Sequence, residues 1–206
     1  PKLAYPAVSA EEAARLGNDL TAWGAEKAGN KEGTIPAYTG GLAVDLMGAG
    51  FDSNKASVNG RQIQPDPFKD EKPLYRITAK NLDQYADKLS ESAKGLFKND
   101  PNFYMDVYPT HRVVNYPQHY LDASLKNATR CKTEQEGNAM KGCKGGMPFP
   151  IPKTGAEVMW NLKAGNYFGA GQLQDAQGVY ADTNGTVVTV SSNYAVFQFP
   201  YQDPRY

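Results

Sequence analysis

A long irregular segment constrains the fold of this chain more than any other feature. Residues 24–75 are rich in Gly, Pro, Asn and Asp and contain few periodic apolar positions. A stretch of this length without secondary structure is uncommon inside a compact domain. We therefore expect residues 1–75 to form a short helix and an extended arm that packs on another surface, and residues 76–206 to form the folded part.

The charge balance excludes some classes of function. Lys and Arg together number 22, as do Asp and Glu, so the formal net charge is zero. A balanced chain lacks the basic footprint of a nucleic-acid-binding protein and gives no sign of a polybasic membrane patch. The apolar runs, such as residues 41–44, are only a few residues long, whereas a spanning helix needs about 20. The sequence therefore predicts no nucleic-acid partner and no transmembrane segment.

Local signals predict three helices. Capping boxes of the form S/T-x-x-E, in which a hydroxyl and a carboxylate satisfy free N–H groups at a helix start, begin at Ser9 and at Thr154. Apolar residues follow the first start at helical spacing as far as Trp23, and Gly17 and Gly24 keep that helix short. A longer apolar stripe predicts a helix over residues 78–97. Asn99-Asp100-Pro101 ends it, because proline disfavours helical backbone in the residue before it.

Strand-like patterns follow the longest predicted helix. Residues 103–108 predict a strand, and residues 111–116 are a candidate partner for it. Residues 120–130 are ambiguous between strand and helix. Further on, Asn184-Gly185 separates two short apolar runs, which is a strong hairpin signal.

The C-terminal part of the sequence predicts an antiparallel meander. Residues 178–182 and 186–190 flank the turn, and residues 194–199 predict a third strand. A sheet this small has open edges and an uncovered face. We therefore expect a sheet that is incomplete in this chain, or one that pairs with strands from elsewhere.

Two cysteines, Cys131 and Cys143, flank a polar loop. So few Cys and His residues do not make a zinc site. We favour a disulfide, with two unrelated buried thiols as the alternative. In the chain-entropy model such a closure stabilises by about 3 kcal/mol, and it indicates an oxidising compartment. The first residues lack the apolar stretch of a signal peptide, so export would mean that the signal has been removed.

Several segments resemble a known bacterial family. They are residues 20–30, 33–41, 66–68, 72–74, 77–85, 107–112 and 146–152, followed by Glu157 and Trp160-Asn161. As an ordered set they resemble the domain-of-unknown-function 1329 family, also described as outer-membrane lipoprotein-sorting-like, over roughly residues 9–162. The Cys pair is not a hallmark of that family.

The resemblance implies a location and a fold. Members are exported from Gram-negative cells, which implies the periplasm or the periplasmic face of the outer membrane. Their fold is thought to be similar to periplasmic lipoprotein carriers: α+β, with helices on one face of a curved antiparallel sheet that holds an acyl-binding cavity. Members are longer than this chain, so we expect an N-terminal portion with an incomplete sheet. They are often encoded near an outer-membrane partner and exporters of hydrophobic molecules.

The residues themselves do not point to catalysis. No G-x-S-x-G, Walker or dinucleotide-binding pattern is present, and we expect His111 to be a hydrogen-bonded structural residue. We therefore predict no enzymatic activity, no cofactor and no metal. Aromatic side chains are the candidate lining for an apolar ligand, with an ordinary core as the alternative: Tyr104, Tyr108, Tyr180, Tyr194, Phe197 and Phe199.

Two functions remain open. The first is a carrier that binds lipid or another hydrophobic small molecule between envelope components. The second is a structural or accessory subunit that docks onto an outer-membrane or exporter protein through its arm and an open strand edge. A carrier requires a concave aromatic face, whereas a subunit requires a flat apolar patch or an open edge.

Overall fold

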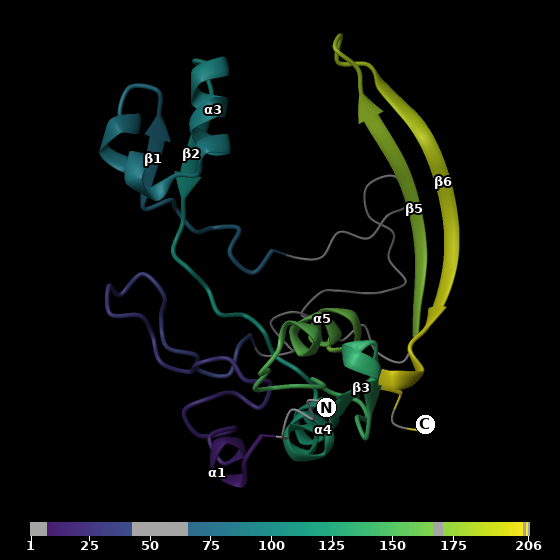
Figure 1. Ribbon diagram of the computed structural model, residues 1–206. Helices are drawn as coiled ribbons and strands as arrows, with labels where there is room; N and C mark the ends of the chain where they lie inside the picture. Colours follow the sequence, from purple (N-terminus) through teal and green to yellow (C-terminus); the bar gives the residue numbers. More distant parts are fainter. Residues whose placement is uncertain (1–7, 43–65, 167–170, 204, 206) are drawn as a thin grey trace. The chain divides into compact units, whose positions relative to one another are not determined.

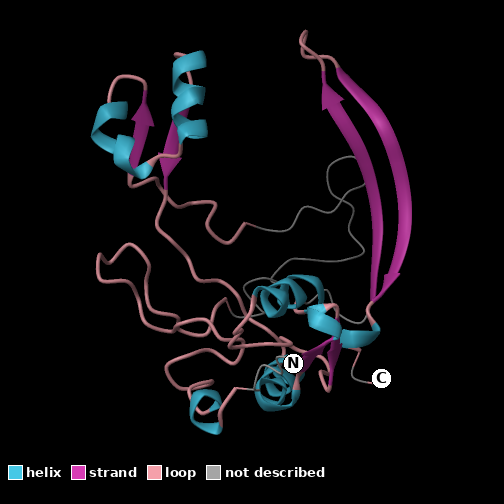
Figure 2. Cartoon of the chain, in the orientation of Figure 1, coloured by secondary structure: helices cyan, strands magenta, loops and turns pink. Residues whose placement is uncertain are grey.

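The computed structural model describes residues 8–42, 66–166, 171–203 and 205 (Figure 1). These residues form an α+β structure with small antiparallel sheets, each of two strands (Figure 2). Part of the expected arm, residues 43–65, lies outside the described residues. The chain divides into two compact units, residues 28–115 and residues 1–27 together with 116–206. The boundary expected after residue 75 falls within the first of these units.

The unit of residues 28–115 contains one small sheet and two helices. Its elements are β1 (Tyr75–Thr78), η2 (Leu82–Lys88), α3 (Glu91–Asn99) and β2 (Tyr104–Val107). Strands β1 and β2 are antiparallel, and Arg76 binds the Asp106 carboxylate across them through Nε and Nη2, at 2.6 and 2.7 Å. Ile77 and Phe97 are buried. The Phe97 ring packs edge-on against Phe103, with centroids 4.8 Å apart.

Two predictions for this unit are wrong. The helix expected over residues 78–97 is interrupted, because Leu89 has extended backbone (φ −108°, ψ 140°). Ser90 then starts α3 afresh, and its hydroxyl accepts a hydrogen bond from the Ala93 N–H at 3.2 Å. A serine favours this N-cap position over the interior of a continuing helix. The partner of β2 is β1, not residues 111–116, which are irregular.

The described part of the arm packs on the same chain. Tyr38 donates its hydroxyl hydrogen to the Val114 carbonyl at 2.9 Å. The Leu42 N–H donates to the Val113 carbonyl at 3.1 Å, and the Asn115 amide donates back to the Leu42 carbonyl at 3.0 Å. Residues 28–42 therefore pack on residues of their own unit.

The other unit carries the remaining elements. They are α1 (Ala10–Ala13), α4 (Gln118–Arg130), β3 (Lys132–Glu134), η3 (Gln135–Gly137), β4 (Ala139–Lys141), α5 (Gly155–Ala164), β5 (Gly171–Ala181), β6 (Val187–Gln198) and η4 (Pro200–Gln202).

Both predicted capping boxes are confirmed. At α1 the Ser9 hydroxyl accepts from the Glu12 N–H at 3.1 Å, and the Glu12 carboxylate accepts from the Ser9 N–H at 3.2 Å. At α5 Thr154 and Glu157 form the same reciprocal pair, at 3.2 and 3.3 Å.

The first helix is short, as its glycines predict, and the apolar spacing between Leu16 and Trp23 is not helical. Helix α1 is four residues long, and Gly17 follows with φ +86°, a left-handed conformation that glycine adopts readily. The Gly17 N–H then donates to the Leu20 carbonyl at 2.8 Å and closes a turn. Leu16 and Leu20 nevertheless stay buried, because the turn packs them against Ala128 of α4.

Helix α4 resolves the ambiguity of residues 120–130 in favour of helix. Its buried face carries Tyr120, Ser124, Asn127 and Ala128, which follow the helical spacing of i, i+4, i+7 and i+8. Two of these four residues are polar, so this face requires hydrogen-bond partners from the chain that covers it.

The predicted hairpin at Asn184-Gly185 is confirmed, but its strands are longer than expected. The Asp182 carboxylate accepts from the N–H groups of Asn184 (2.8 Å) and Thr186 (2.9 Å), and Gly185 has φ +82°. Residues 194–199 do not form a separate third strand. Strand β6 runs without a turn from Val187 to Gln198 and pairs with β5 along its length.

Candidate functional site

The β5–β6 hairpin carries four of the six predicted ligand-lining residues. Side chains alternate between the faces of a strand, and Tyr180 pairs with Val188 while Gly178 pairs with Ser191. A β-bulge between Gly178 and Val179 shifts the register by one residue.

With this register, the four residues do not share one face. Tyr180, Phe197 and Phe199 lie on one face of the hairpin. The rings of Phe197 and Phe199 stack with centroids 6.3 Å apart. Tyr194 lies on the opposite face, next to Val196. The hairpin therefore has one face on which valines flank Tyr194. On its other face, Ser191 and Asn193 separate Tyr180 from the Phe197–Phe199 pair.

The apolar side chains of the hairpin are exposed. Val190 is 63% exposed, Tyr194 69% and Val196 68%. Strand β6 contains no Asp, Glu, Lys or Arg. Within the described residues, β5 and β6 pair only with each other. Soluble proteins rarely leave such contiguous apolar surface uncovered unless it serves an interaction.

The other two predicted lining residues lie in the unit of residues 28–115. Tyr104 is in β2 and is 52% exposed, and the Arg76 guanidinium lies 3.9 Å from its ring centroid. Tyr108 follows β2 and is also exposed. The six residues are thus divided between the two units, and their grouping around one ligand stays a prediction.

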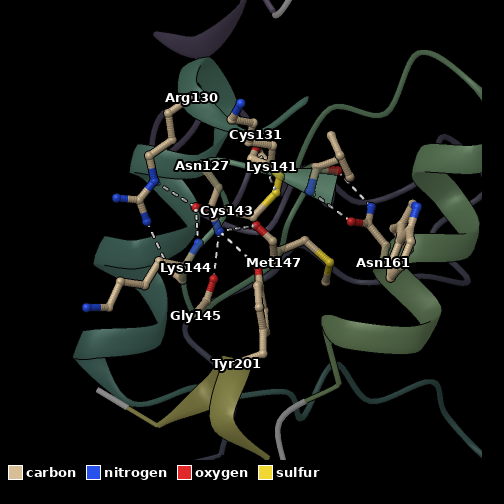
Figure 3. Close-up of a disulfide and its surroundings, with 12 residues drawn as sticks. Asn127, Arg130, Cys131, Lys141, Cys143, Lys144, Gly145, Met147, Asn161 and Tyr201 are labelled. Atoms are coloured by element: carbon tan, nitrogen blue, oxygen red, sulfur yellow. Dashed lines mark hydrogen bonds between the residues drawn. A yellow bond between two sulfur atoms is a disulfide. The ribbon is translucent and has the colours of Figure 1, made fainter. Parts of the chain in front are cut away.

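The predicted disulfide is confirmed. Cys131 and Cys143 are bonded across the base of the β3–β4 hairpin, and Cys131 is buried (Figure 3). The two cysteines are 12 positions apart in the sequence. It ties the end of α4 to the segment that leads into the Pro-rich strap of residues 146–152.

Asn127 organises the segment after the disulfide. Its side chain is fully buried, and its amide donates to the carbonyls of Gly145 (2.6 Å) and Met147 (3.0 Å). Its oxygen accepts from Arg130 Nε (3.0 Å) and from the Lys144 N–H (3.2 Å). Figure 3 shows these bonds converging on Asn127 between α4 and the loop. A single side chain thus fixes the backbone of residues 144–147 against the helix.

Two more buried polar side chains hold the same loop. Ser124 Oγ donates to the Tyr120 carbonyl and accepts from the Met147 N–H, both at 2.8 Å. Gln202 binds Gly146 at both its N–H (3.1 Å) and its carbonyl (3.3 Å). The polar residues on the buried face of α4 are therefore satisfied by loop backbone.

Two tyrosines close this polar core. The Tyr120 hydroxyl donates to the Gly165 carbonyl at 2.5 Å, and the Tyr201 hydroxyl lies 3.3 Å from the Asn127 amide nitrogen. Burial raises the pKa of both phenols well above the usual value. Both stay neutral at physiological pH and act as structural hydrogen-bonding groups.

His111 is hydrogen bonded, as predicted from the sequence. Its Nε2 lies 2.8 Å from a carboxylate oxygen of Glu71, and its ring stacks on Phe68 at 3.9 Å between centroids. In the parts of the chain that the structure describes, no group of three His, Cys, Asp or Glu side chains is placed to hold a metal ion. None of the described helices is long and apolar enough to cross a membrane.

Comparison with known proteins supplies the family. The model of a family described as protein of unknown function, DUF1329, matches residues 76–206. The chain belongs to the DUF1329 family. The uncharacterized protein PA3922 of Pseudomonas aeruginosa is 46% identical to this DUF1329 chain over 156 residues, which are 75% of this chain and 32% of that relative. The chain thus spans about a third of the relative's length. No solved structure matches it.

The structural role of Asn127 is not among the predictions made from the sequence. Asn127-Ala128-Thr129 has the pattern of a glycosylation acceptor, but the amide is buried and fully engaged. The available signal was the spacing of Tyr120, Ser124 and Asn127 on one helical face. Together with the Gly145-Gly146 pair, this spacing could have suggested a helix that holds a loop by its backbone.

Proposed function

We propose that this protein binds the apolar part of a lipid or a similar hydrophobic molecule on the β5–β6 hairpin and carries it between components of the cell envelope. The observation that carries the proposal is the exposed apolar surface that Val190, Tyr194 and Val196 form on one face of β6, a strand without Asp, Glu, Lys or Arg. No covalent chemistry is involved. The ligand is released chemically unchanged.

The hairpin has the size and chemistry for an extended apolar ligand. Strand β6 has 12 residues, and a strand of that length is about 40 Å long. Fully burying one valine or leucine side chain contributes about 1.5–3 kcal/mol. Val187, Val190 and Val196 are each more than 60% exposed. Covering several such side chains supplies enough free energy to hold a long acyl chain.

The proposed location is the periplasm or the periplasmic face of the outer membrane. Two observations support it. A disulfide between Cys131 and Cys143 forms and persists in oxidising compartments. The DUF1329 match agrees with the resemblance that implies export.

A second candidate function is that of an accessory subunit that docks onto a protein partner. Among the described strands, β5 and β6 each pair on one edge only, and this favours docking because the other edge presents backbone groups that can bind another strand. A carrier uses the faces of the hairpin, whereas a docking subunit uses its edges.

Binding of the uncharged dye Nile red tests the carrier proposal. Val190→Thr with Val196→Thr keeps the branched shape but adds two hydroxyls to the exposed apolar surface. We expect about tenfold weaker binding, because each substitution removes roughly 0.8 kcal/mol of apolar contact. The matched control is Val113→Thr with Val114→Thr, two exposed valines outside the hairpin.

The carrier proposal fails if the parent chain does not bind the dye, or if both double variants bind as the parent does. A hairpin that gives concentration-dependent oligomers and no dye binding favours the docking subunit instead.

A further inference from the structure

A cavity of about 290 Å³ lies beside α4, away from the hairpin strands. One side is the exposed flank of the helix, and the other is the loop that Asn127 holds in place. Its lining is dominated by polar and charged side chains and by glycine backbone: His119, Asp122, Lys126, Arg130, Lys144, Gly145, Gly146, Gln202 and Asp203, with Ala123.

Three cations of the lining can face a ligand. Among the described residues, the ammonium groups of Lys126 and Lys144 make no ion pair or hydrogen bond. Arg130 uses Nε for Asn127 and Nη2 for the Lys144 carbonyl, so Nη1 remains available. The two bonds that Arg130 makes also fix its guanidinium plane, which reduces the entropy lost when an anion binds.

The carboxylates of the lining offset only part of this charge. Arg205 binds Asp203 through Nε and Nη2, at 2.9 and 2.5 Å, and lowers its pKa to about 2. Asp122 accepts a hydrogen bond from the Gln118 amide at 2.8 Å. Since Arg205 neutralises Asp203, three cations of the cavity face the single charge of Asp122.

Two residues of the loop wall, Gly145 and Gly146, have no side chain. Gly145 and Gly146 both have left-handed backbone, with φ +60° and +61°. A Cβ on Gly146 would lie 2.6 Å from the Ser124 nitrogen, so the loop approaches the helix as closely as backbone permits. The disulfide and Asn127 hold this arrangement without a ligand.

A second cavity, of about 360 Å³, continues the cationic surface. It shares Arg130 with the first and is lined also by Lys132, Lys141, Gly142 and Glu134. Lys141 and Glu134 form an exposed ion pair at 3.6 Å. Five cationic residues therefore line the two cavities beside the disulfide: Lys126, Arg130, Lys132, Lys141 and Lys144.

We propose that the cavity between α4 and residues 144–146 binds an anionic group, a phosphate or a carboxylate, with Lys126, Arg130 and Lys144 as its ligands. Ammonium and guanidinium groups form short, charge-assisted hydrogen bonds with such oxygens. The anion comes either from a lipid headgroup or from a free solute. The site uses residues outside the hairpin, so it stands whether or not the hairpin binds apolar cargo.

The test measures binding of two probes to the 206-residue chain. Inorganic phosphate is titrated by calorimetry, and phosphatidylcholine vesicles with and without phosphatidylglycerol are used in co-sedimentation. The test variant is Lys126→Gln with Lys144→Gln, because these side chains hold no loop contact and their loss leaves the fold intact. Lys72→Gln with Lys80→Gln removes the same charge from exposed positions in the other unit.

We expect the Lys126/Lys144 variant to bind about tenfold more weakly and the Lys72/Lys80 variant to bind as the parent does. Phosphate binding lost in this pattern identifies a site for free anions. Loss of binding to phosphatidylglycerol vesicles alone identifies a headgroup site. The proposal is overturned if the parent binds neither probe, or if the two double variants lose the same affinity.

Discussion

At the scale of single residues, buried polar groups are prominent in the unit of residues 1–27 and 116–206. Asn127 and Ser124 are fully buried, and each connects α4 to backbone of the following loop. A buried polar group is costly when its partner is lost, because its desolvation is no longer compensated.

Replacing Asn127 therefore has a large predicted effect. Asn127→Ala leaves the Gly145 and Met147 carbonyls and the Lys144 N–H without their partner, and we expect a loss of about 2–4 kcal/mol in the free energy of unfolding. Urea denaturation measures it. The control is Asn18→Ala, since Asn18 is exposed and makes one side-chain bond, to the Ala14 carbonyl. Equal losses in the two variants would show that Asn127 does not hold the loop.

The Asp203–Arg205 pair predicts a dependence of stability on pH. The Arg205 guanidinium and N–H bind the Asp203 carboxylate and lower its pKa to about 2 from 3.8. A lowered folded-state pKa gives stability that is present above about pH 4 and is lost as the pH falls towards 2. Arg205→Gln should lower Tm at pH 6. The difference in Tm between this variant and the parent should become smaller as the pH falls to 2. Asp203→Asn supplies the control, since Arg205→Gln added to it should change Tm little at either pH.

At the scale of elements, local chemistry accounts for the successes and failures of prediction. Capping boxes at Ser9 and Thr154 and the Asn184-Gly185 turn are decided within a few residues, and the structure confirms all three. The first helix is short because Gly17 closes a turn, and Leu16 and Leu20 still reach the core although their spacing is not helical. Periodicity records which residues are buried, but it does not record the backbone path that buries them.

The site was harder to predict than the elements. Aromatic residues of the hairpin were visible in the sequence, but the bulge at Gly178/Val179 sets which of them share a face. The net charge of zero gives no sign of the cationic cavity, because Lys126, Arg130 and Lys144 come together only when α4 and the disulfide loop have folded.

The disulfide is the element whose removal is most easily tested. Cys131→Ser with Cys143→Ser opens the β3–β4 loop, and we expect a loss of about 3 kcal/mol. Equilibrium unfolding in urea measures it, with and without reductant. Reductant should destabilise the parent by the same amount and leave the double variant unchanged. A parent that is indifferent to reductant would show that the loop is held by Asn127 and its neighbours alone.

At the scale of the whole molecule, the chain contains two units that are stabilised in different ways. Residues 28–115 contain a small aromatic and aliphatic core around Ile77 and Phe97. The other unit combines buried polar side chains, a disulfide and a hairpin with exposed apolar side chains. Exposed apolar surface of this kind often marks an interaction site, so the valine and tyrosine side chains of β6 are the feature that function must explain. The DUF1329 match covers this hairpin together with α4 and the disulfide loop.

Native mass spectrometry of the protein purified from a bacterial periplasm tests the central claim most directly. The measurement reports the chain mass, the disulfide, the oligomer and any bound molecule in one spectrum. A carrier predicts adducts of lipid mass that leave on collisional activation and are depleted in the Val190→Thr, Val196→Thr variant. A monomer without adducts, whose spectrum does not change with that variant, would contradict cargo binding by the hairpin.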